Sequence, residues 1–256
     1  MIPIQKLEQS HATAGVHLSK QGVDPAALPT IRTGLCLDVS GSMRHEYRDG
    51  HVQDALTHLL ALAMHMDKSQ RLDVFTFEND CAQCRYPATP DNFHSFVADH
   101  IVGDDSVPKW GGTDYLGVMQ LVYQHYFGNP ASASEHPSHG SGLFGRLLHR
   151  HQDPISAPVS SPAPAQNQAP TAVFFLTDGE TENERAIERL MEAQAGLPLF
   201  WVFVGLAHQS RLLRDLGSEA TGEFILLEDG VRISDDDLYR KLITPKFSQW
   251  LGSHSA

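Results

Sequence analysis

Cysteine is scarce in this sequence, with only three in 256 residues. So low and odd a number does not describe a disulfide framework, and it fits a reducing compartment. Basic residues are also few, since 19 lysines and arginines stand against 31 aspartates and glutamates, a formal net charge of −12. No run of clustered Lys and Arg is present for contacting nucleic-acid phosphates. We therefore expect an acidic, soluble protein that binds no nucleic acid.

Long hydrophobic runs are missing as well. No stretch approaches the roughly 20 consecutive apolar residues that a membrane-spanning helix needs, and the longest run, around residues 61–64, is interrupted by His58 and His65. The first residues hold no apolar block after a basic segment, so we expect no secretory signal. These absences predict a cytoplasmic protein without a membrane span.

What the sequence does contain is an alternation of apolar strands and amphipathic helices. Strands are predicted at residues 33–39, 72–77, 172–177, 199–204 and 224–227. Helices are predicted at residues 51–67, 91–100 with Asp91 as cap, 114–127, 183–194, 209–216 and 234–242. Apolar strands that alternate with helices are typical of a mostly parallel sheet with helices on both faces. The predicted fold class is therefore α/β.

Residues 130–170 depart from this alternation. They carry seven of the 15 prolines and many Ser, Ala and Gln residues, a composition that cannot bury enough apolar surface to offset its ordering entropy. We expect a disordered surface insertion. Its histidines are His136, His139, His149 and His151. They are either metal ligands or incidental, and the second interpretation is favoured because their spacing matches no defined ligand set.

Polar side chains gather where predicted strands end. In open parallel sheets, ligands bind beyond the carboxyl ends of the strands. Two predicted strands end in D-V-S-G-S and T-D-G, and the loop before the predicted helix at residues 114–127 carries G-G-T. The oxygen-bearing side chains concerned are Asp38, Ser40, Ser42, Thr113 and Asp178. Two carboxylates and three hydroxyls suit a hard dication such as Mg²⁺, which takes octahedral oxygen ligands and keeps several waters. With these five ligands the bound metal ion would stay electrophilic enough to accept one further carboxylate.

These three motifs, in this order, resemble the metal-ion-dependent adhesion site of von Willebrand factor type A domains. The resemblance covers about residues 31–251, with the insertion at 130–170, and leaves residues 1–30 as an N-terminal extension and 252–256 as a tail. It implies a Rossmann-like, doubly wound sheet with one antiparallel edge strand. It also implies a Mg²⁺ or Mn²⁺ site on the upper rim of that sheet.

The resemblance further implies a role for each site residue. Ser40, Ser42 and Thr113 would touch the metal directly, and Asp38 and Asp178 would act largely through water. A protein partner would supply an Asp or Glu carboxylate at the sixth position. The segments Y-R-D-G-H-V-Q-D-A-L, L-D-V-F-T-F, L-P-L-F-W-V-F-V-G and D-D-D-L-Y-R-K-L more narrowly resemble the type A domains of bacterial tellurium-resistance and stress-response proteins.

Two functions fit such a site. In the first, the protein is a non-enzymatic, metal-dependent binding module. In the alternative, Mg²⁺ or Mn²⁺ activates water for hydrolysis of a phosphate ester. A dehalogenase-type phosphatase needs an acid/base aspartate two residues after Asp38, where Ser40 stands, and no Walker A or G-x-G-x-x-G motif occurs. Glu180 and His45 are candidate bases only by their nearness in sequence. We therefore expect no enzymatic activity.

Two further patterns have simple interpretations. Cys81 and Cys84 form C-x-x-C in a predicted hairpin. They would be a redox pair, half of a zinc site or ordinary reduced thiols, and the last is favoured because no second pair exists. His51, His58 and His65 recur every seven residues, about 10.5 Å apart on a helix and too far for shared metal ligation. We expect them on a solvated helix face.

Overall fold

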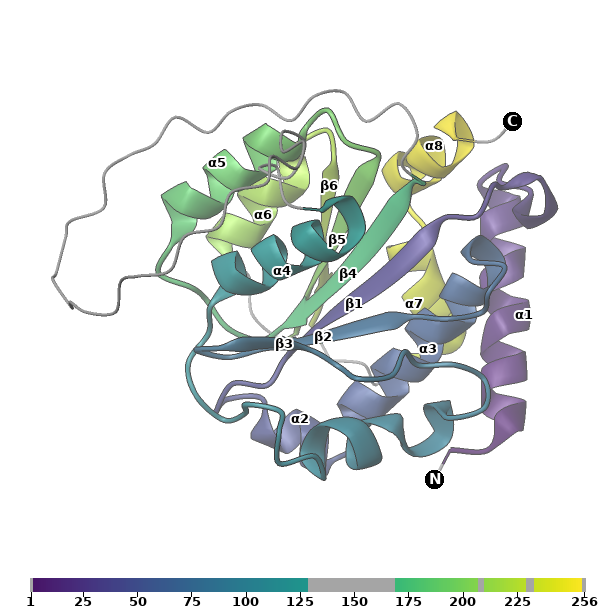
Figure 1. Cartoon of the computed structure of the whole chain (residues 1–256). Helices are drawn as coiled ribbons and strands as arrows, with labels where there is room; N and C mark the ends of the chain where they lie inside the picture. Colours follow the sequence, from purple (N-terminus) through teal and green to yellow (C-terminus); the bar gives the residue numbers. More distant parts are fainter. Residues whose placement is uncertain (1, 129–168, 207–209, 229–232, 255–256) are drawn as a thin grey trace, which may run out of the picture.

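A six-stranded sheet forms the centre of the computed structural model, which describes residues 2–128, 169–206, 210–228 and 233–254 (Figure 1). The strands are β1 (Arg32–Asp38), β2 (Asp73–Phe77), β3 (Cys81–Gln83), β4 (Thr171–Thr177), β5 (Leu199–Leu206) and β6 (Gly222–Leu227). Only the edge strand β3 runs antiparallel to its neighbour; all other pairs of the described sheet are parallel. The predicted α/β class and antiparallel edge strand are confirmed. The predicted insertion, apart from residues 169–170, lies outside the described residues.

The strand order places the predicted site at a switch point. The order is β3-β2-β1-β4-β5-β6, so the chain builds outward from β1 in one direction and then returns to add β4 on its other side. Leu37 of β1 pairs with Leu176 of β4, which brings the carboxyl ends of these two strands together. Ligands of open α/β sheets bind in the crevice at such a point.

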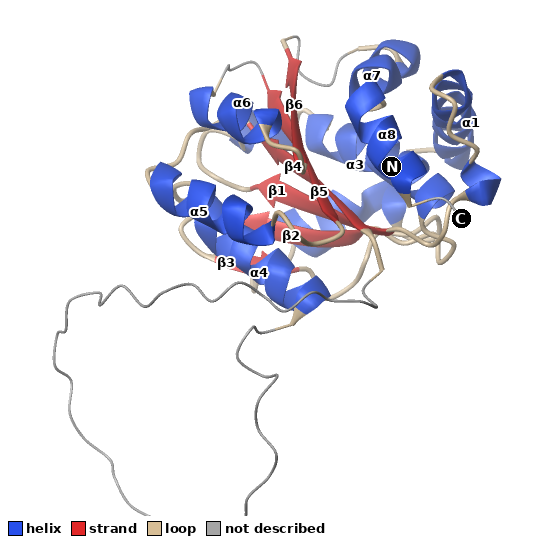
Figure 2. Cartoon of the chain, turned by 90° about the horizontal axis from the view of Figure 1, so that it is seen from above, coloured by secondary structure: helices blue, strands red, loops and turns tan. Residues whose placement is uncertain are grey.

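Helices cover both faces of the sheet (Figure 2). One face carries α1 (Ile4–Lys20), α3 (His51–Met66), α7 (Asp235–Leu242) and α8 (Pro245–Ser253), and the other carries α4 (Tyr115–Phe127), α5 (Glu184–Gln194) and α6 (Arg211–Ser218). Successive side chains of a strand point to opposite faces, so Phe174 of β4 joins the first core and Phe175 the second. Among the described residues, none of the helices is both long and apolar enough to cross a membrane.

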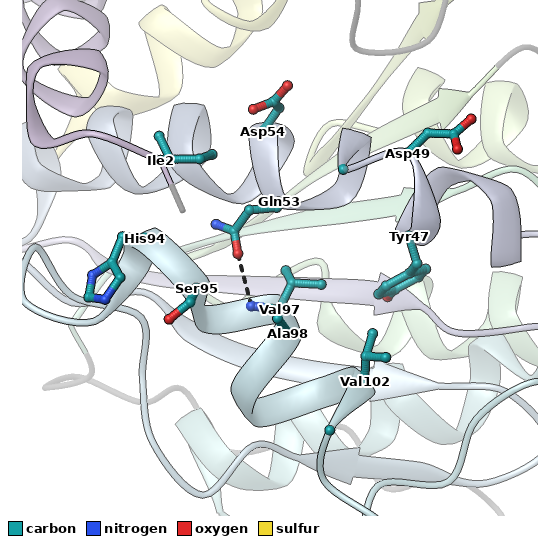
Figure 3. A pocket seen from close by; sticks show the side chains of 12 residues that line it. Ile2, Tyr47, Asp49, Gln53, Asp54, His94, Ser95, Val97, Ala98 and Val102 are labelled. Carbon is teal, nitrogen blue, oxygen red and sulfur yellow. Dashed lines mark hydrogen bonds between the residues drawn. The ribbon is translucent and has the colours of Figure 1, made fainter.

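One predicted helix is wrong in form. In place of a helix over residues 91–100 capped by Asp91, the chain makes a 3-10 turn at Phe93–Ser95 and a π-helical turn at Ala98–Val102. The side chain of Gln53 on α3 explains the difference. Its Nε2 donates to Phe93 O at 2.7 Å. Its Oε1 accepts from Val97 N at 3.0 Å, the bond drawn as a dashed line in Figure 3. In a regular helix these two backbone groups would bond to each other, so Gln53 takes the place of a helical hydrogen bond.

The N-terminal helix α1 packs against α3 and α7, which the sequence patterns did not predict. Ser10 Oγ lies 2.8 Å from His58 Nδ1 and 2.6 Å from Tyr239 OH. The imidazole rings of His11 and His65 stack with centroids 3.8 Å apart. His58 is only 3 % exposed, so the expectation of a solvated histidine face is wrong. The reason is that α1 and α7 cover His58 and α1 covers His65, while His51 Nδ1 lies 2.6 Å from Glu46 Oε2.

Candidate metal centre

Asp38, the last residue of β1, forms the floor of the predicted site. Its side chain is fully buried, Oδ1 accepts the N–H of Ser40 at 2.8 Å, and Oδ2 accepts the hydroxyl of Thr177 at 2.5 Å. Burial raises the pKa of Asp38 to about 6; the nearby charge of Asp178 also raises it, and the hydrogen bonds oppose the rise. Such a buried carboxylate is stabilised by a cation beside it.

Ser40, Ser42 and Asp178 continue the site toward the surface. Ser40 Oγ lies 3.1 Å from Ser42 Oγ, and Ser42 Oγ donates to Asp178 Oδ1 at 2.8 Å. Neighbouring vertices of an octahedron with metal–oxygen distances near 2.1 Å are about 3.0 Å apart. The two serine hydroxyl oxygens therefore have the spacing of adjacent ligands of one Mg²⁺ ion, and Asp178 accepts the hydrogen bond of Ser42 beside them. These oxygen donors fit such an ion. Ser40 is buried whereas Ser42 is exposed, so the site opens at Ser42.

Thr113 reaches the same place from the loop before α4. A Cβ atom placed on Gly179 would lie 3.4 Å from Thr113 Oγ1 and 3.8 Å from Asp38 Oδ2. The hydroxyl of Thr181 donates to Thr113 O at 3.0 Å, tying the two loops together. The structure thus brings all five predicted site residues to the carboxyl ends of β1 and β4. That they bind a metal stays a prediction.

Glu78 supports this site and was missed from sequence. Its backbone oxygen accepts the N–H of Asp114 at 2.6 Å, directly after Thr113. A Cβ atom on Gly111 would lie 1.5 Å from Glu78 Oε2, so any side chain at position 111 would displace Glu78. The neighbouring Asn79 Oδ1 accepts the N–H of Gly112 at 3.1 Å. Glu78 follows a predicted strand, so the rule that marked the other strand ends would have found it.

Tyr115 was also missed, and no sequence pattern marks it. Its buried hydroxyl donates to Gly179 O at 2.6 Å and lies 3.1 Å from Thr177 Oγ1. The ring packs edge-on against Phe77 and Phe175. Burial raises the pKa of Tyr115 well above its ordinary value, so the phenol stays protonated and acts as a donor that fixes the T-D-G turn.

The remaining predicted candidates lie apart from these five oxygens or are otherwise engaged. His45 has Nδ1 2.8 Å from Ser42 O and Nε2 3.0 Å from Glu46 Oε1, so both ring nitrogens have partners. Cys81 and Cys84 are free thiols, and burial raises the pKa of Cys84 to about 12, which makes it a poor nucleophile. Within the described ranges, no group of three or more His, Cys, Asp or Glu side chains has a metal-binding arrangement.

A separate pocket of about 530 Å³ lies between α3 and the turns at residues 93–102 (Figure 3). Apolar side chains such as Val97 and Val102 and polar ones such as Asp54 and His94 line it. None of the five site residues does. The pocket is therefore distinct from the candidate metal centre.

Comparisons with known proteins decide the family. A family model described as "vWA-TerF-like: vWA found in TerF C terminus" matches residues 30–136 and 147–256. The chain belongs to this family. A Bacillus subtilis relative of the vWA-TerF-like domain, described as uncharacterized protein YcbR, is 28% identical over 228 residues, which are 87% of this chain and 78% of that protein.

Solved structures with a similar fold are more distant from this vWA-TerF-like domain. The ArnB paralog VWA2 from Sulfolobus acidocaldarius has a TM-score of 0.46 at 14% identity, covering 84% of this chain and 45% of that one. Proximal thread matrix protein 1 from the mussel byssus has a TM-score of 0.49 at 12% identity, covering 84% and 47%. Another structure of the mussel protein, with a zinc-occupied MIDAS motif, has a TM-score of 0.43 at 12% identity, covering 87% and 46%. Our chain spans less than half the length of each.

Metal affinity of the vWA-TerF-like domain is expected to fall as the pH drops below about 6. The pKa of Asp38 is raised from its ordinary value of 3.8 to about 6, so at lower pH a cation must displace its proton. Affinity at pH 5 should be roughly tenfold below that at pH 7.5. Calorimetry with Mg²⁺ at both pH values measures this, and equal affinities would contradict the role of Asp38.

The same shift sets the pH dependence of the metal-free fold. Because the pKa of Asp38 is higher in the fold than in the unfolded chain, the protonated Asp38 carboxyl stabilises the fold fully below pH 3.8, and this contribution is lost as the pH rises through about 6.

A cation that removes this proton should release about half a proton per ion at pH 6. Calorimetry in buffers of different ionisation enthalpy measures the release.

Proposed function

We propose that this vWA-TerF-like domain is a non-enzymatic protein-binding module that works with Mg²⁺ or Mn²⁺. The observation that carries the proposal is the 3.1 Å spacing of the Ser40 and Ser42 hydroxyl oxygens, with Asp178 Oδ1 accepting from Ser42 Oγ at 2.8 Å and Asp38 buried beneath them. Ser40, Ser42 and Thr113 would contact the ion, and the two aspartates would hold its waters. A cation bound there would supply an electrophilic position for an incoming carboxylate.

Charge balance supports a partner that brings a carboxylate. Two aspartates neutralise a dication and three hydroxyls add no charge, so an Asp or Glu side chain meets no excess of negative charge at the ion. The exposed Ser42 lies at the mouth of the site, where a protein surface can reach it. The family suggests a setting in tellurium resistance or chemical-stress response, in the cytoplasm.

Hydrolysis of a phosphate ester is the alternative, and it needs a general base within hydrogen-bond reach of an attacking water. His45 has partners on both ring nitrogens, and the raised pKa of Tyr115 keeps that phenol protonated. Glu180 is exposed, outside the hydrogen bonds that join the site oxygens. These contacts favour binding over catalysis.

The proposal predicts metal-dependent recognition of a single carboxylate. In Mg²⁺, a blocked glycine peptide with one glutamate should bind, and its glutamine counterpart should not. Thr113→Ala should weaken binding of the glutamate peptide roughly tenfold or more, because a ligand of the ion is lost. Titration followed by NMR measures both, and excess chelator should release the peptide. Ser19→Ala, which removes an exposed hydroxyl on α1, is the matched control and should change nothing.

Enzymatic activity is tested on the same samples. The wild type should turn over neither p-nitrophenyl phosphate nor nucleoside triphosphates in Mg²⁺ or Mn²⁺. Metal-dependent turnover that disappears in both Asp38→Ala and Asp178→Ala would overturn the binding-module proposal in favour of the hydrolase.

A further inference from the structure

An arginine without an acidic partner stands at the rim of the candidate metal centre. Arg44 begins α2 (Arg44–Arg48), two residues after Ser42, and its side chain is exposed. Its guanidinium carbon lies 5.3 Å from the centre of the Trp110 ring. Among the described residues, no carboxylate pairs with Arg44, whereas Arg48 on the same helix pairs with Asp49 at 2.9 Å.

The aromatic ring beneath Arg44 is firmly held. The ring of Trp110 packs edge-on against Tyr47 with centroids 5.4 Å apart, and Tyr47 belongs to the core. The backbone of Trp110 has φ +74°, a conformation that a bulky residue adopts only when its surroundings impose it. The surroundings here include the bond from Trp110 N to Val39 O, 2.6 Å long.

The same backbone bonds place Arg44 and Trp110 beside the metal-site loops. Gly41 N donates to Gly111 O at 3.0 Å, so the D-V-S-G-S turn and the segment leading to Thr113 lie side by side. A Cβ atom on Gly41 would lie 3.6 Å from Trp110 O. The stacked guanidinium therefore shares one rim with the open side of the site at Ser42.

We propose that Arg44, held on Trp110, binds a second carboxylate of the partner segment whose first carboxylate completes the metal site. The inference rests on the proposed function and deepens it, because the partner then presents two acidic residues close together. A guanidinium has five N–H donors in a planar fork that matches a carboxylate. Stacking on an aromatic face leaves the edge of that fork free to donate.

The test uses blocked glycine peptides that carry one glutamate, or two glutamates separated by zero to three glycines. In Mg²⁺, the best-spaced diacidic peptide should bind wild type about two- to fivefold tighter than the single-glutamate peptide, as one exposed ion pair provides. Arg44→Gln should remove this advantage and leave the single-glutamate affinity unchanged. Arg48→Gln, on the same helix but already paired with Asp49, should keep the advantage.

A second readout identifies the contact directly. The Nε–H signal of Arg44 in an NMR spectrum should shift with the diacidic peptide in Mg²⁺ and stay in place with the single-glutamate peptide. If the diacidic peptide keeps its tighter binding in Arg44→Gln, or if this variant weakens binding of both peptides equally, the role of Arg44 is overturned and the proposed function still stands. Inorganic phosphate that displaces the diacidic peptide at equal concentration would reassign Arg44 to phosphoryl groups. Absence of Mg²⁺-dependent binding by the single-glutamate peptide would instead remove the proposed function, and this inference with it.

Discussion

Asp38→Ala is expected to weaken Mg²⁺ and Mn²⁺ binding by about 100-fold. Asp38 lies at the floor of the site, where its two oxygens orient Ser40 and the Thr177 hydroxyl. Without it, only Asp178 balances the charge of the cation. Titration calorimetry with each metal at pH 7.5 measures the loss.

The fold should survive this substitution because two effects on the free energy of unfolding oppose each other. Removing Asp38 leaves the Ser40 N–H and the Thr177 hydroxyl without their acceptor, which costs of order 1–3 kcal/mol per buried group. It also removes a buried carboxylate whose pKa is raised to about 6 and which is therefore destabilising when ionised. Circular dichroism and thermal unfolding check the fold. Glu188→Ala on the exposed side of α5 is the control, and equal metal binding by Asp38→Ala and this variant would refute the site.

Tyr239→Ala is expected to lower the free energy of unfolding by about 3–5 kcal/mol, since a fully buried aromatic ring is removed. The hydroxyl of Tyr239 lies 2.6 Å from Ser10 Oγ on α1 and donates to His58 O on α3 at 2.8 Å. The ring and hydroxyl thus connect α7 with both other helices. Denaturant unfolding followed by circular dichroism measures the change in the free energy of unfolding.

Two other tyrosine variants make this result specific. Tyr239→Phe keeps the ring and loses the hydroxyl, so it should cost about 1–3 kcal/mol. Tyr86→Ala, at a side chain that is 47% exposed, should stay within about 0.5 kcal/mol of wild type. If Tyr239→Ala were as mild as Tyr86→Ala, α1 and α7 would not be integral parts of the fold.

Five of the six strands were predictable because they carry their own signal, whereas the short edge strand β3 was expected only as part of a hairpin and from the family resemblance. β4 and β5 are apolar along nearly their whole length, as strands buried on both faces must be. The turns at residues 93–102 were not predictable in the same way. Their form depends on Gln53, which is 40 residues away from Phe93 in the chain, and a local periodicity carries no information about such a partner.

The residues of the candidate site also differ in how far the sequence predicts them. Asp38 ends β1, and Ser40 and Asp178 follow the ends of β1 and β4. Because parallel strands bring their carboxyl ends to one edge of a sheet, sequence order was enough to group these three residues. Tyr115 is the first residue of α4, and its bond to Gly179 spans 64 residues. A buried tyrosine at such a position looks like any other core residue until its partner is known.

Short-range patterns were enough to predict the α/β alternation and the three motifs that hold the five oxygen-bearing side chains of the candidate site. They also suggested the family, which the match to the family model then showed. Which helix faces are covered depended on the packing of segments that are far apart in the chain. His51, His58 and His65 look like a solvated stripe in sequence, yet Ser10 and Tyr239 close over His58 from positions 48 and 181 residues away. Whether a polar side chain is exposed is a property of what packs against it, and that partner is chosen by the fold of the whole chain.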